Sequence, residues 1–246
     1  MSPSTKSSAQ PLRNQAALTT GATRGIGLAI AHALAAQGCN LILTGRDEKA
    51  LNRISRELAS AKVKTLAHPC DLRDPKSIDA LFRAIRRQFA TLDILINNAG
   101  IAHANLTVDK LPSTIWKDVI DTNLTGTFLI MQAALPMMKS GGTIVNNLSI
   151  VANRVFAGSA AYVASKHGAL GLTNTLREEL RPKGIRVIAL MPGATNTDIW
   201  NSFWPQAPRK KMMSAATIAT AVVNAILLPH NATVETIEIL PTAGLL

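Results

Sequence analysis

Aromatic and sulfur-containing side chains are scarce in this chain of 246 residues. Only 4% of the residues are Phe, Trp or Tyr, and Tyr162 is the single tyrosine. Side chains on which nucleic-acid bases could stack are therefore few. The two cysteines, Cys39 and Cys70, lack the spacing of a metal or redox site, and two thiols make no disulfide framework. We expect reduced thiols in a cytoplasmic protein that binds no metal.

Long apolar runs are absent as well. No stretch reaches the roughly 18 apolar residues that a membrane-spanning helix needs, so we expect no membrane partner. The segment Met1–Asn14 is rich in Ser, Pro and Gln and lacks the apolar stretch of a secretory signal. We interpret residues 1–14 as a flexible tail. Residues 15–246 then form one domain, because a single α/β sheet of this size is ordinary.

Positive charge is in surplus, with 26 Lys and Arg residues against 15 Asp and Glu and a formal net charge of +11. Such a surplus raises the possibility of nucleic-acid binding. However, basic residues alternate with acidic ones, as in Arg177–Arg181, and the longest basic cluster, Arg209–Lys211, is short. We therefore expect solvated faces and no nucleic-acid partner. An anionic small molecule such as a phosphorylated cofactor would still benefit from the surplus.

Short apolar runs alternate with longer amphipathic stretches from Ala16 onward. The apolar runs predict strands at Ala16–Leu18, Asn40–Leu43, Lys64–Ala67, Ile94–Ile96, Thr143–Asn147, Arg186–Ala189 and Thr236–Ile239. The amphipathic stretches predict helices at Gly25–Gln37, Glu48–Ser60, Pro75–Phe89, Ser113–Lys139, Ala160–Leu180 and Ala215–Leu228. We expect Asp74 to cap the third helix ahead of Pro75 and Ser214 to cap the last one. Apolar strands between helices are typical of a parallel sheet covered on both faces. With right-handed crossovers, the pattern predicts a doubly wound (Rossmann) α/β fold with a seven-stranded parallel sheet.

A glycine-rich turn, Thr20–Gly27, directly follows the first predicted strand and opens a helix. Glycines allow a tight turn and a close approach to a pyrophosphate, whose charge is favoured at a helix N-terminus. A strand before the turn and a helix after it are the context that this motif requires. The turn predicts a dinucleotide site that includes Gly21, Thr23, Arg24, Gly25, Ile26 and Gly27.

The end of the second predicted strand indicates which dinucleotide binds. An acidic residue there would bind a free ribose 2′-OH, but Gly45 takes that position and Arg46 follows it. Guanidinium groups of Arg46 and Arg24 can both pair with a 2′-phosphate, which favours NADP(H) over NAD(H). Asp47 is either a cap for the next helix or, with a register shift of one residue, a ribose ligand.

Tyr162 and Lys166 lie four residues apart in a predicted helix and so project from one face. A lysine charge close to a phenol favours the phenolate and lowers the phenol pKa from about 10. Such a phenol can act as a general acid or base near neutral pH. The spacing alone is common, because tyrosine and lysine fall four apart on many helices where the tyrosine only packs.

Further short motifs occur in a fixed order beside the predicted elements. They are Asp71-Leu72, Asn97-Asn98-Ala99-Gly100, Asn123, Ser149, the Tyr162/Lys166 pair and Pro192-Gly193. Together with the glycine-rich turn, they resemble the short-chain dehydrogenase/reductase family in its single-domain form. The resemblance runs from about Ala16 to the last predicted strand.

The resemblance implies a catalytic tetrad of Asn123, Ser149, Tyr162 and Lys166. Tyr162 would exchange a proton with the substrate oxygen, and Ser149 would hydrogen-bond the same oxygen. Lys166 would lower the phenol pKa and contact the nicotinamide ribose, and Asn123 would hold a water that links Lys166 to solvent. The alternatives are a strand-end cap for Ser149, a helix bend for Asn123 and a surface charge for Lys166.

The resemblance also implies the residues that surround the cofactor. It assigns Asp71 and Leu72 to the adenine end. On the adenosine ribose side it places Asn97, Ala99 and Gly100. At the nicotinamide end it places Pro192, Gly193, Thr195 and Thr197, together with Tyr162 and Lys166. A polar turn is the alternative for each of these segments.

Three aromatic residues, Trp200, Phe203 and Trp204, fall where the family places its substrate loop. Aromatic side chains bury a large area and occur in ligand pockets, so we expect a mobile apolar lid. The alternative is a hydrophobic patch that anchors a loop or a subunit contact. The opposite wall of the substrate pocket would include Val151, Phe156 and Ala157, with Arg154 as its one charge.

These features predict an NAD(P)(H)-dependent oxidoreductase, with NADPH-dependent reduction of a small carbonyl compound to a secondary alcohol as the expected reaction. The alternatives are a 3-oxoacyl-[acyl-carrier-protein] or other 3-oxoacyl thioester reductase and an NADP-sensing protein without turnover. The ending Leu240–Leu246 departs from the Asp-Gly-Gly turn of many relatives, which weakens the thioester assignment. The resemblance implies a homodimer or homotetramer formed by the helices that contain Asn123 and Tyr162.

Overall fold

The computed structural model describes residues 10–245, whose strands form one parallel sheet in the order β3-β2-β1-β4-β5-β6-β7. The strands are β1 (Ala16–Thr20), β2 (Asn40–Gly45), β3 (Thr65–Pro69), β4 (Ile94–Asn97), β5 (Thr143–Asn147), β6 (Arg186–Pro192) and β7 (Thr236–Ile239). This confirms the predicted seven-stranded doubly wound sheet. The order reverses between β1 and β4, and an open sheet of this kind leaves a crevice there at its carboxyl edge.

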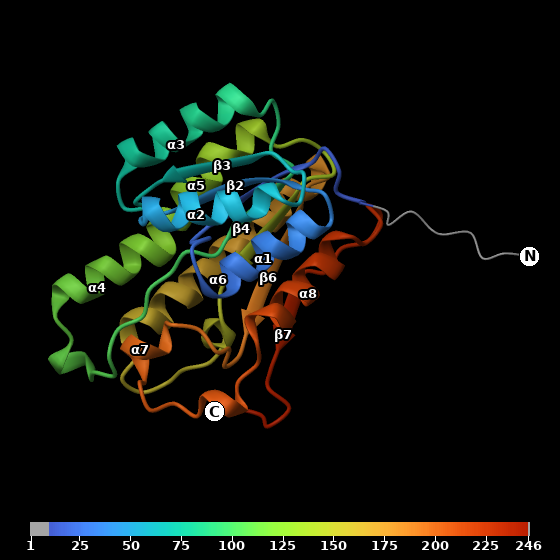
Figure 1. The fold of residues 1–246 in the computed structure, drawn as a ribbon. Helices are drawn as coiled ribbons and strands as arrows, with labels where there is room; N and C mark the ends of the chain where they lie inside the picture. Colours follow the sequence, from blue (N-terminus) through green and yellow to red (C-terminus); the bar gives the residue numbers. More distant parts are fainter. Residues whose placement is uncertain (1–9, 246) are drawn as a thin grey trace, which may run out of the picture.

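Helices cover both faces of the sheet (Figure 1). They are α1 (Gly25–Ala36), α2 (Glu48–Ala59), α3 (Pro75–Gln88), α4 (Ser113–Ile120), α5 (Gly126–Ala134), α6 (Ala160–Leu180), α7 (Trp200–Phe203) and α8 (Ala215–Ile226). Side chains of α1, α2 and α8 share one buried cluster with β2 residues Leu41 and Leu43. Side chains of α3, α5 and α6 pack with Ile42, which points to the other face because strand side chains alternate.

Side-chain caps fix where three helices begin. The Asp47 carboxylate accepts a hydrogen bond from the Ala50 backbone N–H (2.9 Å) at the start of α2. Asp74 caps α3 ahead of Pro75, and Ser214 caps α8, as predicted. Of the two roles open to Asp47, the structure therefore supports the helix cap.

The prediction of one uninterrupted α-helix over Ser113–Lys139 is wrong. A π-helical segment, Asp121–Thr125, separates α4 from α5, and a short 3₁₀ turn follows at Leu135–Met137. Pro136 has no N–H to continue the ladder, so the α-helical bonds stop near it. Amphipathic periodicity does not reveal one wider turn, and such turns often occur at functional sites.

Residues 10–15, ahead of the first strand, are held by the rest of the domain. The prediction of a flexible tail over residues 1–14 is wrong for residues 10–14, while residues 1–9 lie outside the described part. Leu12 is only 4% exposed and packs in the core, and its backbone N–H donates to the Gln37 carbonyl (3.1 Å). A lone leucine among polar residues gave no periodic signal. Among residues 10–245, no helix combines the length and apolarity needed to cross a bilayer.

Candidate active site

The carboxyl edge of the sheet opens into a cavity of about 900 Å³. It extends from the glycine-rich turn after β1, past the ends of β2 to β6, to the N-terminal part of α6 and to α7. Ligand pockets in proteins have volumes of this order. All the predicted site residues line this cavity except Gly27, Asn97, Asn123 and Arg154.

The glycine-rich turn has the geometry that a phosphate cradle requires. Gly21 and Gly25 have φ of +63° and +57°, in the left-handed region that favours glycine. A Cβ on Gly21 would lie 2.8 Å from the Ala99 Cα, and a Cβ on Gly27 would collide with the Asn98 side chain. The N-cap residue of α1, Arg24, makes no capping hydrogen bond through its side chain to any described residue, so the first N–H groups of the helix are available to an anion.

The turn is held by Asn98, a residue that we did not assign to the site. Its side-chain amide donates to the backbone carbonyls of Thr20 (3.0 Å) and Gly21 (3.1 Å). The prediction that Asn97 lines the cavity is wrong, because its side chain is buried and donates to Asn146 (2.8 Å). Successive residues at the end of β4 point in opposite directions, so only one of the two can face the cavity.

Asn123 lies in the π-helical segment and is only 2% exposed. Its side-chain oxygen accepts from the Ile101 N–H (2.8 Å), and its amide donates to the Ile101 carbonyl (2.8 Å) and the Ser165 hydroxyl (3.1 Å). A Cβ on Gly100 would lie 3.3 Å from the Asn123 oxygen and 3.6 Å from the Lys166 ammonium. The Asn123 side chain therefore fixes the segment after β4 beside Lys166.

Tyr162, Lys166 and Ser149 meet at the opposite end of the cavity from the residues that follow β2 and β3. The Lys166 ammonium lies 5.7 Å from the Tyr162 ring centroid and donates to the Asn147 carbonyl (2.9 Å). Burial raises the pKa of Tyr162 to about 12, and a hydrogen bond with Ser149 acts weakly in the other direction. Burial lowers the pKa of Lys166 to about 8.

These shifts correct our expectation that the lysine charge lowers the pKa of the phenol. Withdrawal of Tyr162 from water is the largest cause of its shift, because burial disfavours the charged form of any group. At neutral pH the phenol keeps its proton and is ready to donate it. The spacing of Tyr162 and Lys166 in the sequence does not indicate how deeply their side chains are buried.

Ser149 has an unusual backbone conformation, with φ of +137° and ψ of 162°. Residues other than glycine rarely adopt it, and such strain costs about 1–3 kcal/mol. The Ser149 hydroxyl oxygen accepts from the Val151 N–H (3.3 Å). The chain turns sharply here, directly after β5, and the turn presents the hydroxyl to the cavity beside Tyr162.

The three clustered aromatic residues pack on one another next to Tyr162. The ring centroid of Phe203 lies 6.2 Å from that of Tyr162 and 5.6 Å from that of Trp200. The ring centroids of Trp200 and Trp204 are 6.3 Å apart. The Trp200 indole N–H donates to the Thr195 carbonyl (2.8 Å). Two of these residues, Trp200 and Phe203, lie in the short helix α7, which we had expected to be a loop.

The C-terminal segment forms part of the cavity wall, which the sequence did not lead us to expect. Leu240, Gly244 and Leu245 line the cavity, and the Gly193 N–H donates to the Ile239 carbonyl (2.8 Å). The apolar residues Leu240 and Leu245 after the last strand could have predicted that this segment packs against the domain. The expectation that Arg154 lines the pocket is wrong, because its guanidinium pairs with Glu238 on β7 (2.6 Å).

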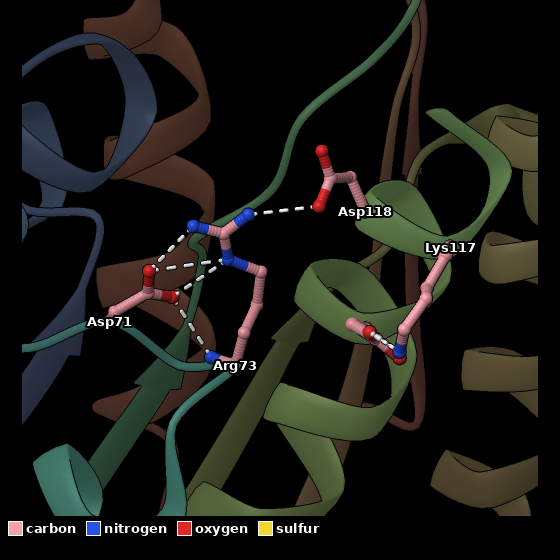
Figure 2. Close-up of polar contacts among 5 residues, drawn as sticks. Asp71, Arg73, Lys117 and Asp118 are labelled. Carbon is pink, nitrogen blue, oxygen red and sulfur yellow. Dashed lines mark hydrogen bonds and ion pairs between the residues drawn. The ribbon is translucent and has the colours of Figure 1, made fainter. Parts of the chain in front are cut away.

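Charged side chains gather at the other end of the cavity, where β2 and β3 end. Asp71 lines the cavity and is bound by Arg73, whose guanidinium also reaches Asp118 on α4 (Figure 2). Hydrogen bonds from Arg73 lower the pKa of Asp71 to about 2. Arg24 forms a longer, exposed ion pair with Asp198 (3.6 Å), which solvent screens strongly.

Comparison with known proteins identifies the family. Residues 15–208 match the family model described as short chain dehydrogenase. A 3-oxoacyl-[acyl-carrier-protein] reductase of Staphylococcus aureus is 39% identical over 189 residues, which cover 75% of this chain and 76% of that protein. A 3beta-hydroxysteroid dehydrogenase of Mediterraneibacter gnavus is 38% identical over 183 residues, with 74% and 66% covered.

Solved structures agree with this match. An alcohol dehydrogenase from the archaeon Thermococcus sibiricus, complexed with 5-hydroxy-NADP, is 30% identical and superposes with a TM-score of 0.87. The superposition covers 93% of this chain and 97% of that one. The chain belongs to the short-chain dehydrogenase family and is an oxidoreductase of that family.

Proposed function

We propose that the protein is an NADPH-dependent reductase that converts a carbonyl compound to a secondary alcohol. The observation that carries the proposal is a protonated phenol, Tyr162, placed beside Ser149 and Lys166 in the same cavity as the glycine-rich turn. A phenol that keeps its proton at neutral pH suits a general acid for carbonyl reduction.

The residues present fit a phosphorylated dinucleotide. Gly21 and Gly25 have the positive φ of a tight turn, and Gly21 lies too close to Ala99 for a side chain. The start of α1 that follows favours a pyrophosphate. Arg46 lines the cavity directly after β2, where a ribose 2′-phosphate would need a cation. Solved relatives contain NADP or NADPH, and one, a 3-ketoacyl-(acyl-carrier-protein) reductase from Brucella melitensis, contains NADH. We therefore propose NADP(H) as the preferred cofactor and NAD(H) as a weaker one.

When bound, the reduced nicotinamide supplies a hydride to the carbonyl carbon. Tyr162 donates its proton to the carbonyl oxygen, and Ser149 donates a hydrogen bond to the same oxygen and so orients the carbonyl group. With a pKa of about 8, Lys166 is mostly protonated at neutral pH. Its charge stabilises the phenolate that remains after the transfer. Asn123 keeps the segment after β4 in place beside Lys166.

Apolar groups surround the substrate end of the cavity. Val151, Phe156 and the aromatic cluster of α7 line it, so a substrate with apolar groups around the reacting carbonyl fits best. Reduction of a 3-oxoacyl thioester is a second candidate, supported by the reductases of that name among the relatives. The exposed Lys210 and Lys211 lie close in sequence to α7 and could receive an acidic carrier protein.

A panel of ketones, aldehydes, diketones and 3-oxoacyl thioesters, followed through NADPH absorbance, tests the proposal. We expect consumption of NADPH with at least one carbonyl class, and the ratio kcat/KM ranks the classes. The Tyr162→Phe protein serves as the control for background oxidation. Tight NADPH binding without turnover of any carbonyl would point to a cofactor-sensing protein instead.

We also propose that residues 15–246 act as one domain of a cytoplasmic homodimer or homotetramer. Trp116 on α4 and Phe128 on α5 are each 43% exposed, which suits an apolar contact between copies. Cys39 and Cys70 are buried free thiols, as expected in a reducing compartment. Light scattering coupled to size-exclusion chromatography tests the assembly. A monomer at micromolar concentration would contradict it.

A further inference from the structure

Arg46 and Asp71 face the same end of the cavity with opposite charges. Strands β2 and β3 pair side by side, with Gly45 opposite Pro69, and the Cys70 N–H donates to the Gly45 carbonyl (2.8 Å). The residues that follow these strands, Arg46 and Asp71, therefore emerge next to each other, and both line the cavity. A carboxylate at this place could neutralise the very cation that a 2′-phosphate needs.

Arg73 already satisfies that carboxylate (Figure 2). Its guanidinium donates through Nε and Nη2 to both carboxylate oxygens of Asp71, with a shortest distance of 2.7 Å, and its backbone N–H donates to Oδ1 (3.0 Å). The remaining nitrogen, Nη1, donates to Asp118 on α4 (2.9 Å). A guanidinium held on two sides in this way has little freedom to turn away from Asp71.

Arg46 is left without an acidic partner. Within residues 10–245, no Asp or Glu oxygen lies within 4.0 Å of an Arg46 nitrogen, and Arg46 is exposed. The charge of Arg46 makes the smallest contribution to the lowering of the Asp71 pKa, so the two groups attract each other weakly. Because the two residues follow paired strands, Asp71 could attract Arg46 if Arg73 did not hold the carboxylate.

We propose that Arg73 is a positioning residue that sets the preference for NADPH over NADH by occupying Asp71 and so leaving Arg46 free for the 2′-phosphate. The inference rests on the proposed cofactor. As the structure stands, the two carboxylates and the two guanidinium groups balance. Without the Arg73 charge, the group carries one net negative charge beside the place of the 2′-phosphate, and Asp71 is free to pair with Arg46.

The test is cofactor binding by the Arg73→Gln protein, measured by titrating the fluorescence of NADPH and of NADH. Because only NADPH carries the 2′-phosphate, we expect its Kd to rise roughly fivefold to tenfold, while the Kd of NADH changes by less than about twofold. The difference should shrink as salt is added, since the groups are partly exposed. An equal rise for both cofactors would mean that Arg73 only maintains the loop, and would overturn the proposal.

Three matched variants separate charge from structure. The double variant Asp71→Asn/Arg73→Gln should regain most of the wild-type ratio of the two Kd values, because the uncompensated carboxylate is gone. Arg73→Lys should fall between wild type and Arg73→Gln, since it keeps the charge and loses the fork. Asp118→Asn, which removes the other partner of Arg73, should leave the ratio unchanged or slightly higher. A double variant with a ratio as low as that of Arg73→Gln would also overturn the proposal.

The same titration distinguishes a failure of this inference from a failure of the proposed function. Wild-type protein that binds neither nucleotide contradicts the proposed function, and with it the inference. Wild-type protein that prefers NADPH, with an unchanged preference in Arg73→Gln, contradicts the inference alone.

Discussion

At one end of the cavity Asp71 and Arg73 are partly exposed and paired, whereas at the other end burial dominates the ionisable groups Tyr162 and Lys166. Arg73 and Asp71 hold each other at the surface, and the pKa of Asp71 falls to about 2. Tyr162 and Lys166 are dominated by burial, which moves the pKa of the phenol up to about 12 and that of the ammonium down to about 8. Hydrogen bonds from Arg73 control the pKa of Asp71 at the first end, and desolvation controls the pKa values at the second.

Because different forces act at the two ends, each end can be changed without the other. Substitutions near Arg46 and Asp71 should alter which dinucleotide binds and how tightly. Substitutions at Tyr162 and Lys166 should alter turnover and its pH dependence. Measurements that separate Kd from kcat therefore test whether the two ends act independently.

The largest effect is expected at the catalytic end from Tyr162→Phe. The proton donor is lost while the ring keeps its packing on Phe203, so carbonyl reduction should fall by about a thousandfold or more. The Kd of NADPH should change by less than about threefold, measured by fluorescence titration. Retained turnover would remove Tyr162 from its proposed role.

Arg46→Ala should have the largest effect at the other end. Loss of a guanidinium that pairs with the 2′-phosphate should weaken NADPH about tenfold or more and NADH by less than about twofold. Parallel titrations of the two cofactors check this, and kcat at saturating cofactor should stay close to that of the wild type. Equal weakening of NADH would reject a contact with the 2′-phosphate.

The pH dependence of reduction should reflect Lys166. Burial places its pKa at about 8, so the ammonium is present below this pH and is lost as the pH rises through it. We expect kcat for carbonyl reduction to decline about tenfold per pH unit above about pH 8. In Lys166→Met, kcat should be low and this decline absent. A wild-type profile that is flat from pH 7 to pH 10 would contradict the role of the ammonium.

Phe203→Ala should produce the smallest effect and tests the aromatic cluster as a lid. Removing a ring that lies between Trp200 and Tyr162 should raise the KM of an apolar carbonyl substrate about fivefold, because apolar contact area is lost. The Kd of NADPH should not change. As a control, Val108→Ala removes an exposed apolar side chain that does not line the cavity and should leave KM unaltered.

Much of the fold and of the cofactor turn could be predicted, because local patterns determine them. Apolar runs gave all seven strands, and Gly21 and Gly25 adopt the backbone conformations that only glycine reaches easily. Asp74 and Ser214 cap helices as their positions indicated. In each case a few adjacent residues carry the whole signal.

The features that we missed depend on contacts between distant segments. The π-helical turn that carries Asn123 is stabilised by bonds to Ile101 and Ser165, which no periodicity reports. The direction of the Tyr162 pKa shift depends on how far the surrounding chain excludes water. The family resemblance placed Asn97 at the cavity, but its side chain donates to Asn146 on the neighbouring strand, a contact that only the folded sheet brings together.

Because Tyr162 is the sole phenol in the chain, its ionisation can be followed without any label. The near-ultraviolet absorption of tyrosinate would arise from this one side chain, so an absorbance titration of the unmodified protein reads the proton-donating group directly. The same band, recorded in a stopped-flow mixer, would show whether a phenolate accumulates while product is formed.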